Sequence, residues 1–389
     1  MHIVHYLSRI RLADGGVVRA VLDICSLMAQ SGHDITILTG DGSDVSAEWL
    51  RESQHHPSVV LLPDHADGSG ARFSEGALAL AEEVIAKADV VHLHTVWDRA
   101  NLQCGALATR HNVRYVITAH GMLDDWSMAQ RALKKRLYHF MFLRSFFREA
   151  HAVHLTASHE KTQAERWFPK EKGVVIPLIF DLEPYRELPG SGPARAAIAA
   201  LKTPGPKVLF LSRIHPKKSV EVLIDAIAKV RSMPGCSETQ LLIAGTGDAA
   251  YEAQLKEQVE QLGLHEHVHF LGLVVGEEKI SLFETADVFA LPTSQENFGF
   301  VLVEALATQT PVVTTKGVDI WPELEASGGA LIEDRSADVF ARAIGALLLD
   351  SPRRERMGEV GRKWVFEYLE PSHIVKQFEA MYQIGSVGA

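Results

Sequence analysis

Two glutamates, Glu296 and Glu304, bracket the short segment Phe298-Gly299-Phe300. Apolar runs predict a strand over Val288–Leu291 before them and another over 311–314 after them, with a helix over 300–308 between. In such a strand–helix–strand unit, ligands bind at the loop beyond the strand's carboxyl end, and free amides at the helix start attract an anion. A single glutamate near a helix N-terminus often only interacts with the helix dipole. It is the two glutamates together that indicate a ligand-binding site.

A basic segment follows the strand that is expected to open the second half of the chain. Residues 212–218 read Ser-Arg-Ile-His-Pro-Lys-Lys, which places Arg213 and Lys218 five positions apart. Fixed cations at such a strand end could bind and stabilise an anionic group. Standing alone, the segment would be interpreted as a solvated basic turn.

Two loops of the first half are weaker candidates. Asp14-Gly15-Gly16 precedes a helix expected at 17–30, where glycines let the backbone approach a phosphate or sugar, although a tight turn is the simpler interpretation. His120 ends a strand expected at 114–119, so its side chain should face the crevice rather than the core. His92 and His94 share one face at the end of another expected strand, and one of them is a candidate for lining a substrate pocket.

The elements that must position these residues form two series. Short apolar runs alternate with helical patterns over 1–181, which indicates an α/β fold with a doubly wound parallel sheet. The segment 182–206 is rich in Pro and Gly and predicts a linker with a short helix, after which the alternation restarts. Pro371 should break the chain before the last helix. Strands are expected at 2–7, 34–39, 88–94, 114–119, 152–157, 207–214, 241–245, 268–271, 288–291, 311–314 and 330–332.

Bulk properties exclude several classes of protein. A formal net charge of -10 over 389 residues argues against nucleic acid as a partner. The three cysteines are far apart and form no CxxC pair, so neither a disulfide framework nor a zinc site is expected. The start MHIVHYL is typical of a strand rather than a signal peptide, and no apolar run reaches a membrane span. These features favour a cytoplasmic protein.

The whole pattern resembles the family 4 retaining glycosyltransferases (glycosyltransferase group 1 type) of the GT-B fold. The resemblance lies in E-x7-E around F-G, in A-x-x-x-P-V-V from Ala307, and in R-x4-K from Arg213. It covers nearly the whole chain and is most specific over 207–315. It implies two Rossmann-like domains that face each other across a cleft: an acceptor-side domain 1–181 with helix 372–389, a linker 182–206, and a nucleotide-sugar domain 207–371.

The resemblance also implies roles for individual residues. Arg213 and Lys218 should grip the donor diphosphate, Glu296 the sugar hydroxyls and Glu304 the ribose, while His120 should bond the sugar near the reaction centre. The catalytic set is then His120, Arg213, Lys218 and Glu296. Further donor-binding positions are Gly15, Gly16, Leu273 (in 271–274, whose backbone holds the base), Asn297, Phe298, Gly299 and Phe300.

The sequence departs from the family pattern at three positions. Asn297, Ser219 and Gln309 each stand where Gly is common. Asn tolerates a left-handed backbone, so the change at Asn297 is expected to be mild. The change at Gln309 falls at the helix end, away from the expected ligand.

The function implied is transfer of a hexose from a nucleotide diphosphate sugar, with UDP-glucose the first expectation, to a glycan or lipid-linked glycan in surface polysaccharide biosynthesis. Neither a metal nor a cofactor is expected beyond the nucleotide sugar, and the reaction should retain the anomeric configuration. Two alternatives stay open: a nucleotide-sugar epimerase or hydrolase on the same fold, and a non-catalytic nucleotide-sugar binding protein. An NAD-dependent oxidoreductase is poorly supported, since GxGxxG is missing.

One segment fits a different partner. Residues 131–148 carry six Lys and Arg and no Asp or Glu, with apolar and aromatic residues between them. A basic helix with an aromatic face can lie on an anionic membrane surface, which would make the protein peripheral at the inner face of the membrane. The alternative is a core helix whose basic residues face water.

Overall fold

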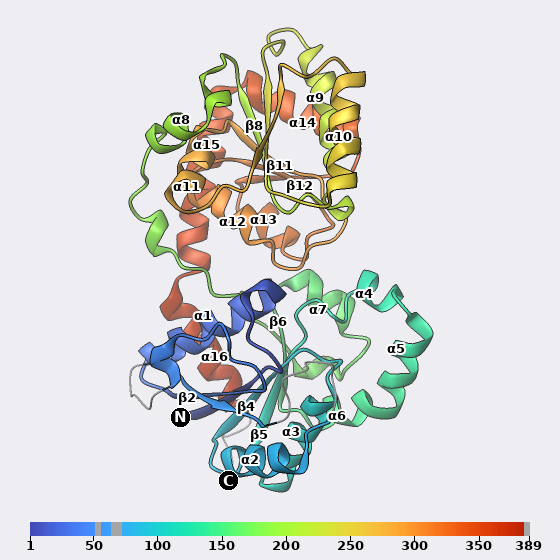
Figure 1. Cartoon of the computed structure of the whole chain (residues 1–389), viewed down its shortest axis with the longest axis vertical. Helices are drawn as coiled ribbons and strands as arrows, with labels where there is room; N and C mark the ends of the chain where they lie inside the picture. The colour runs from blue at the N-terminus through green and yellow to red at the C-terminus, as the bar shows by residue number, and fades with distance from the viewer. Residues whose placement is uncertain (51–55, 64–71, 385–389) are drawn as a thin grey trace. The chain divides into compact units, whose positions relative to one another are not determined.

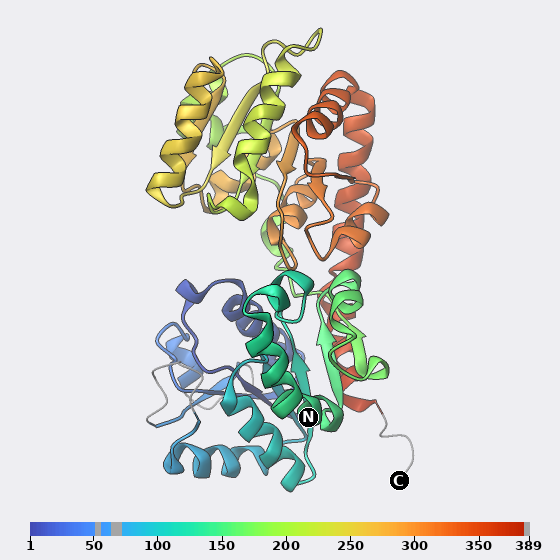
Figure 2. The same ribbon diagram turned by 90° about the vertical axis from the view of Figure 1, so that its right-hand side faces the viewer.

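The chain folds into two compact α/β units. The structure is a computed structural model that describes residues 1–50, 56–63 and 72–384. Unit 1 comprises Met1–Phe180 with Pro371–Ala389, and unit 2 comprises Asp181–Glu370. Each is a parallel sheet between helical layers (Figures 1 and 2), so the predicted α/β class is confirmed.

The sheet of unit 1 has seven parallel strands in the order β3-β2-β1-β4-β5-β6-β7. Two of them were not predicted, β3 and β7, which lie at the two edges of the sheet, have only four and three residues, and contain no fully buried residue. The strands are β1 His2–Tyr6, β2 Asp34–Thr39, β3 Ser58–Leu61, β4 Val90–His94, β5 Arg114–Thr118, β6 Ala152–Leu155 and β7 Gly173–Val175.

Helices cover both faces of this sheet because side chains alternate along each strand. On β1, Val4 and Tyr6 belong to the large apolar core under α2 and α3, whereas His5 points to the opposite face. That opposite face packs against α1 and α16, which contact each other (Figure 1). The helices of unit 1 are α1 Gly16–Gln30, α2 Glu75–Ile85, α3 Arg99–Arg110, α4 Asp125–Ala129, α5 Ala132–Tyr138, α6 Arg144–Glu149, α7 Ser158–Ala164 and α16 Pro371–Gln383.

Unit 2 repeats the architecture with six parallel strands in the order β10-β9-β8-β11-β12-β13. The strands are β8 Lys207–Leu211, β9 Gln240–Ala244, β10 Val268–Gly272, β11 Val288–Leu291, β12 Val312–Thr315 and β13 Ala330–Glu333. The helices are α8 Gly192–Ala197, α9 Val220–Arg231, α10 Ala249–Gln261, α11 Gly276–Thr285, α12 Phe300–Ala307, α13 Trp321–Ala326, α14 Ala337–Leu349 and α15 Ser351–Tyr368.

The segment expected to be a linker, 182–206, packs as part of unit 2. Its helix α8 lies along α11, where the amide of Ala194 donates to the hydroxyl oxygen of Ser281 at 3.0 Å. The same Ser281 hydroxyl donates to the carbonyl of Gly190 at 2.6 Å. This polar junction at a buried serine attaches the segment to the unit that follows it in sequence.

The face of the unit 1 sheet toward α1 and α16 is rich in histidine, and this predicts an unusual pH dependence of stability. Burial lowers the pKa of His5 and His120 to about 3 and that of His154 to about 4, and the pKa values of His92 and His94 also fall well below 6.5. The unfolded chain takes up protons near pH 6.5, but the folded chain does not. Stability is therefore lost as the pH falls below 6.5, by up to about 1.4 kcal/mol per pH unit for each histidine.

Urea unfolding between pH 7.5 and 5 measures this loss. His5→Phe is the matched control, because His5 makes one side-chain hydrogen bond and its removal should lower the slope by about one proton. A free energy of unfolding that does not change over this pH range, or an unaltered slope in His5→Phe, would contradict the prediction.

Candidate active site

The site in unit 2 lies where the strand order changes direction. β8 and β11 are neighbours in the sheet, but the chain continues from β8 to β9 on one side and from β11 to β12 on the other. Ligands of open α/β sheets bind outside the carboxyl ends of the strands at such a switch point. The loop after β8 carries Arg213 and Lys218, and the loop after β11 carries Glu296. The topology alone therefore brings the two predicted segments together.

Lys218 and Glu296 form an ion pair at this point. Lys218 is mostly buried, with 10% of its side chain exposed, whereas 28% of the Glu296 side chain is exposed. Burial, and then the charges of Arg213 and Lys217, lower the pKa of Lys218 to about 8. The Glu296 carboxylate acts in the opposite direction, because it stabilises the charged amine. Three predicted site residues thus share one electrostatic environment.

The loop of Glu296 is tied to its neighbours through the backbone. The amide of Ser294 donates to the carbonyl of Lys217 at 2.7 Å, and the amide of Glu296 donates to the carbonyl of Gly317 at 2.8 Å. The side-chain amide of Asn297 donates to Asp319 at 3.1 Å. These bonds hold the carboxylate of Glu296 on a fixed backbone rather than on a free loop.

The three departures from the family pattern have different structural consequences. Asn297 does not adopt a left-handed backbone, so the expected reason for its tolerance is wrong; its side chain is used for the bond to Asp319. Ser219 and Gln309 do adopt left-handed backbones, with φ of 51° and 64°. Both positions therefore require the conformation that glycine adopts without strain.

Close packing of two glycines supports the Arg213 loop. A Cβ on Gly245 would lie 1.9 Å from the carbonyl oxygen of Ser212, and one on Gly247 would lie 1.9 Å from that of Ile214. The amide of Ile214 donates to the carbonyl of Thr246 at 2.9 Å. Gly245-Thr246-Gly247 thus packs directly against the backbone of the Arg213 loop.

Glu304 lies on α12, eight residues beyond Glu296, and has partners of its own. Lys279 of α11 pairs with it at 2.7 Å, and 14% of the Glu304 side chain is exposed. Burial, and then the Glu304 carboxylate, raise the pKa of Tyr185 well above its usual value. Sequence reasoning missed both partners, since Tyr185 falls in the segment expected to be a linker and Lys279 belongs to no motif.

The remaining predicted positions of unit 2 line the start of α12 and the end of β10. Gly299 has φ of 68° and directly precedes α12, while Phe298 is buried and its ring lies tilted against that of Phe300, with ring centroids 5.2 Å apart. Leu273 follows the left-handed Gly272 and is 73% exposed. Leu273 therefore lies at the surface of unit 2.

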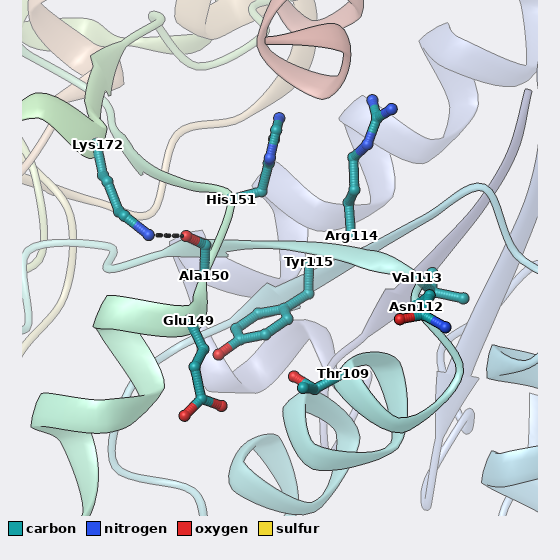
Figure 3. A pocket seen from close by; sticks show the side chains of 9 residues that line it. All are labelled: Thr109, Asn112, Val113, Arg114, Tyr115, Glu149, Ala150, His151 and Lys172. Carbon is teal, nitrogen blue, oxygen red and sulfur yellow. Dashed lines mark hydrogen bonds between the residues drawn. The ribbon is translucent and has the colours of Figure 1, made fainter. Parts of the chain in front are cut away.

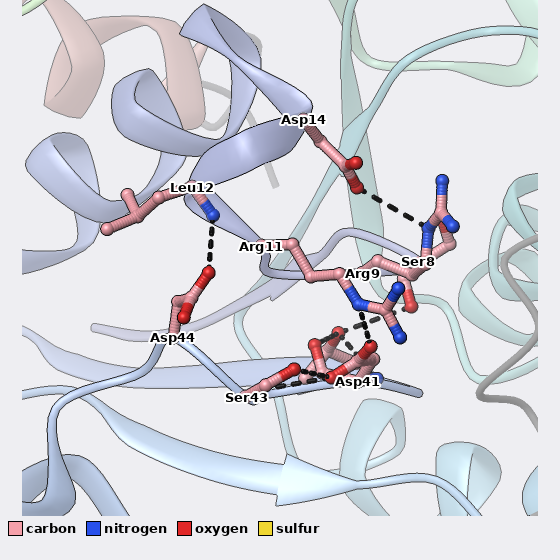
Figure 4. Close-up of polar contacts among 9 residues, drawn as sticks. Ser8, Arg9, Arg11, Leu12, Asp14, Asp41, Ser43 and Asp44 are labelled. Atoms are coloured by element: carbon pink, nitrogen blue, oxygen red, sulfur yellow. Dashed lines mark hydrogen bonds and ion pairs between the residues drawn. The ribbon is translucent and has the colours of Figure 1, made fainter.

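In unit 1 the Gly15-Gly16 loop is fixed by ion pairs and hydrogen bonds to the loop after β2 (Figure 4). Arg11 pairs with Asp41, Arg9 lies 3.5 Å from Asp14, and the amide of Leu12 donates to Asp44 at 2.7 Å. Gly15 has φ of 98°, and α1 starts at Gly16 with open space around both glycines. The loop is thus preformed and leaves the start of α1 accessible.

His120 occupies a strained turn at the carboxyl end of β5. Its φ is 51° and that of Gly121 is 72°, and the amide of Gly121 donates to the buried carboxylate of Glu160 at 2.6 Å. The same carboxylate accepts hydrogen bonds from the amide and hydroxyl of Thr156 at 2.6 and 2.8 Å. Strained backbone of this kind persists only where the surroundings hold it, and it concentrates at functional sites.

His92 and His94 do not line an open pocket, because both are buried beneath α1 and α16. The pocket in Figure 3 lies at the opposite end of the same sheet, where β5 begins at Arg114. It has a volume of about 420 Å³, but Lys172, one of its cations, already donates to the carbonyl of Ala150 at 2.6 Å. It contains none of the predicted site residues.

The segment 131–148 combines both structures that the sequence left open. From Leu143 onward its apolar residues join the core, with Phe146 and Phe147 buried. Before that point most of the large apolar residues are exposed, among them Leu133 at 84% and Phe140 at 68%, whereas Tyr138 is partly buried against the core. The two parts meet at the π-helical turn His139–Leu143. Among the described residues, no helix is long and apolar enough to span a membrane.

Comparison with known proteins agrees with this geometry. Residues 195–364 match the family described as glycosyl transferases group 1, and residues 15–178 match the glycosyl transferase 4-like domain. The chain is 30% identical over 384 residues to the phosphatidyl-myo-inositol mannosyltransferase of Mycobacterium leprae (strain TN), covering 96% of this chain and 95% of that protein. It is 28% identical over 360 residues to the GDP-mannose-dependent alpha-(1-6)-phosphatidylinositol monomannoside mannosyltransferase of Mycobacterium tuberculosis (strain CDC 1551 / Oshkosh). That match covers 87% of this chain and 86% of that protein.

Solved structures show the same fold. Anabaena Alr3699/HepE in complex with UDP superposes with a TM-score of 0.76 at 18% identity, covering 97% of this chain and 98% of that one. WaaG, a glycosyltransferase involved in lipopolysaccharide biosynthesis, superposes with a TM-score of 0.66 at 18% identity. The superposition covers 99% of this chain and 100% of that one. The chain belongs to family 4 of the GT-B glycosyltransferases, the group 1 type, and is a glycosyltransferase.

Proposed function

We propose that this glycosyltransferase transfers a hexose from a nucleotide diphosphate sugar to a glycan or lipid-linked glycan acceptor, with retention of the anomeric configuration and without a metal. The observation that carries the proposal is the cluster of Arg213, Lys218 and Glu296 at the switch point of unit 2. Two cations and a carboxylate on adjacent loops suit a ligand with an anionic diphosphate next to a hydroxyl-rich ring.

In the proposed reaction, negative charge develops on the departing diphosphate and positive charge develops on the sugar ring. The bond between the anomeric carbon and the diphosphate oxygen breaks, and its electron pair stays on that oxygen, where Arg213 and Lys218 stabilise the charge. The acceptor hydroxyl oxygen forms the new bond on the same face of the sugar, and its proton passes to the departing phosphate. Glu296 binds sugar hydroxyls and stabilises the positive charge of the ring. Cationic side chains then perform the role that a metal ion would otherwise have.

Glu304 and the exposed end of β10 complete the donor site in this proposal. Glu304 accepts hydrogen bonds from the ribose hydroxyls, with Lys279 holding its carboxylate in place. Backbone at Leu273 contacts the base, and the amides at the start of α12 face the donor. Gly15, Gly16 and His120 are proposed to bind the donor from unit 1.

UDP-glucose is the donor that we propose, and GDP-mannose is the rival to be tested. The relatives with high coverage favour the rival, because one of them is named as GDP-mannose-dependent. The fold neighbour from Anabaena is bound to UDP in one structure and to UDP-glucose in another. A backbone contact at Leu273 would accept either base, so side chains of the described site do not select one.

The proposal is tested by incubating the protein with UDP-glucose and with GDP-mannose, each with and without a lipid-linked glycan acceptor and with and without EDTA. We expect acceptor-dependent release of UDP, unchanged by EDTA, and an axial product linkage from the axial donor. Arg213→Ala and Lys218→Ala should each lose about 2–4 kcal/mol of transition-state stabilisation, the range for one preorganised group. Ser212→Ala, in the same loop, is the control and should keep most of the activity.

Each contrary outcome identifies a different error. Complete loss of activity with EDTA, restored by Mg²⁺, would overturn metal independence, and an inverted linkage would overturn retention. Turnover of donor without acceptor would indicate an epimerase or hydrolase. Donor binding without any turnover would indicate a binding protein, and activity with GDP-mannose alone would overturn the choice of donor.

We further propose that the exposed part of 131–148 binds an anionic membrane surface, which would place the protein at the inner face of the cytoplasmic membrane. Leu133, Leu137, Phe140 and Met141 recur with helical spacing and are all exposed. Exposed cations stand beside them, namely Arg131, Lys134, Arg136, Arg144 and Arg148. An apolar stripe between cations fits the boundary between lipid head groups and acyl chains.

Flotation with vesicles tests the membrane proposal. The protein should float with phosphatidylglycerol-containing vesicles and not with pure phosphatidylcholine, because each Lys or Arg near an anionic surface contributes about 1 kcal/mol. Leu133→Ser with Phe140→Ser should abolish flotation. Leu349→Ser, which changes an exposed leucine of unit 2 outside this segment, should leave flotation unchanged. Equal binding to both vesicles, or concentration-dependent dimers that the double variant dissociates, would contradict a lipid partner.

A further inference from the structure

Five histidines meet on the face of the unit 1 sheet that is covered by α1 and α16. They form two separate hydrogen-bonded chains across neighbouring strands: one through His92 and His154, the other through His5, His94 and His120. Burial lowers the pKa of all five, so each ring is neutral at pH 7 and carries one N–H. A neutral imidazole that donates from one nitrogen can only accept at the other.

The first chain has a fixed direction because it ends on a carbonyl. The carbonyl of Ile176 can only accept, so His154 donates to it from Nε2 at 2.8 Å. Nδ1 of His154 therefore accepts from the Thr118 hydroxyl at 2.8 Å, and that hydroxyl accepts from Nε2 of His92 at 2.6 Å. Nδ1 of His92 is left to accept from the Tyr382 hydroxyl at 2.8 Å. Every polar atom of this chain is satisfied by one arrangement of protons.

The second chain leads from the core to a predicted site residue. Nδ1 of His5 lies 3.0 Å from Nε2 of His94, and Nδ1 of His94 lies 3.1 Å from Nε2 of His120. His5 is fully buried, and its Nε2 has no partner among the described residues. At the other end, no hydrogen bond from a described residue reaches Nδ1 of His120, which is only partly buried.

The unpartnered atom at the buried end decides the direction of this chain. If Nε2 of His5 carried the proton, a buried N–H would have no acceptor, which is rarer in proteins than an acceptor without a donor. The proton is therefore on Nδ1 of His5, which donates to His94. His94 then donates from Nδ1 to Nε2 of His120. The remaining proton of His120 must sit on Nδ1.

We propose that His5 and His94 are positioning residues that keep His120 in the Nδ1–H tautomer, so that His120 donates a hydrogen bond to an oxygen of the donor sugar. This inference rests on the proposed function only for the identity of the ligand. Glu160 supplies the matching support for the backbone, because its carboxylate holds the amide of Gly121. Side chain and backbone of His120 are thus fixed from two independent directions.

A metal site is the alternative use of the cluster, since His5, His92 and His94 offer ligand nitrogens within 4.8 Å of one another. Both nitrogens of His92 and both of His94 already have hydrogen-bond partners. Nδ1 of His5 likewise pairs with Nε2 of His94 at 3.0 Å, so the hydrogen-bonded arrangement uses five of the six ring nitrogens of these three residues. The geometry favours the proton chain over a metal.

Nitrogen-15 NMR of ring-labelled histidine tests the proposal on the ligand-free wild-type protein. Protonated and unprotonated ring nitrogens have widely different shifts, and His120→Asn assigns the signals of His120. We expect Nδ1 of His120 to be protonated and Nε2 unprotonated at pH 7.5. The opposite tautomer, a mixture, or a shift of these signals by stoichiometric Zn²⁺ would overturn the proposal, and none of these readouts depends on activity.

Variants separate positioning from a purely structural role. His5→Phe and His94→Phe should give mixed tautomers of His120 and raise KM for the donor about fivefold, the effect of one neutral hydrogen bond, with a smaller change in kcat. His92→Phe, equally buried on the same strand as His94, should lower Tm while tautomer and KM stay unchanged. An unchanged tautomer in His94→Phe would contradict the proposal. If the tautomer is as expected but no nucleotide sugar is turned over, the proposed function fails and the proton chain stands.

Discussion

A mostly buried lysine paired with a carboxylate is the interaction on which the unit 2 site depends. Burial and the neighbouring cations lower the pKa of Lys218 to about 8, and its partner Glu296 stabilises the charged amine. Glu296 in turn is held by backbone bonds to a third loop. In the proposed reaction the diphosphate replaces the carboxylate as the partner of Lys218. Glu296 is then released to the sugar, so the ligand-free pair keeps both groups in place until the donor arrives.

The parallel sheet makes this pair possible. Because β8 and β11 are adjacent and their chains diverge, two loops that are far apart in sequence start side by side. Gly245 and Gly247 then allow a backbone to approach the Arg213 loop more closely than any other residue type would permit. In unit 1 the corresponding support is polar: ion pairs fix the Gly15-Gly16 loop, and a carboxylate with a row of neutral imidazoles supports His120.

Sequence reasoning worked where a short motif and a strand end coincide. The α/β class and the long buried strands could be predicted from alternating apolar runs and helical patterns, and Arg213, Lys218 and Glu296 were grouped by the family resemblance; the sheet order places their loops on neighbouring strands. Sequence reasoning failed where the relevant contacts form only in the folded structure and leave no local sequence pattern. Tyr185 and Lys279 reach Glu304 from segments without a motif, and the edge strands β3 and β7 are only four and three residues long. The hydrogen-bond partners of His120 could not be predicted for the same reason, because His5 and His94 come close to it only when the strands pair in the sheet.

The central claim is that Lys218 holds the diphosphate, Glu304 the ribose and Glu296 the sugar ring. Calorimetric titration of UDP, which lacks the sugar, into three variants tests it most directly. Glu304→Gln and Lys218→Met should weaken UDP binding by roughly 1.5–3 kcal/mol, the range for a hydrogen bond to a charged group. Glu296→Gln should bind UDP at least as well as the wild type, because Lys218 loses its internal partner. Weaker UDP binding in Glu296→Gln together with unchanged binding in Glu304→Gln would contradict the assignment.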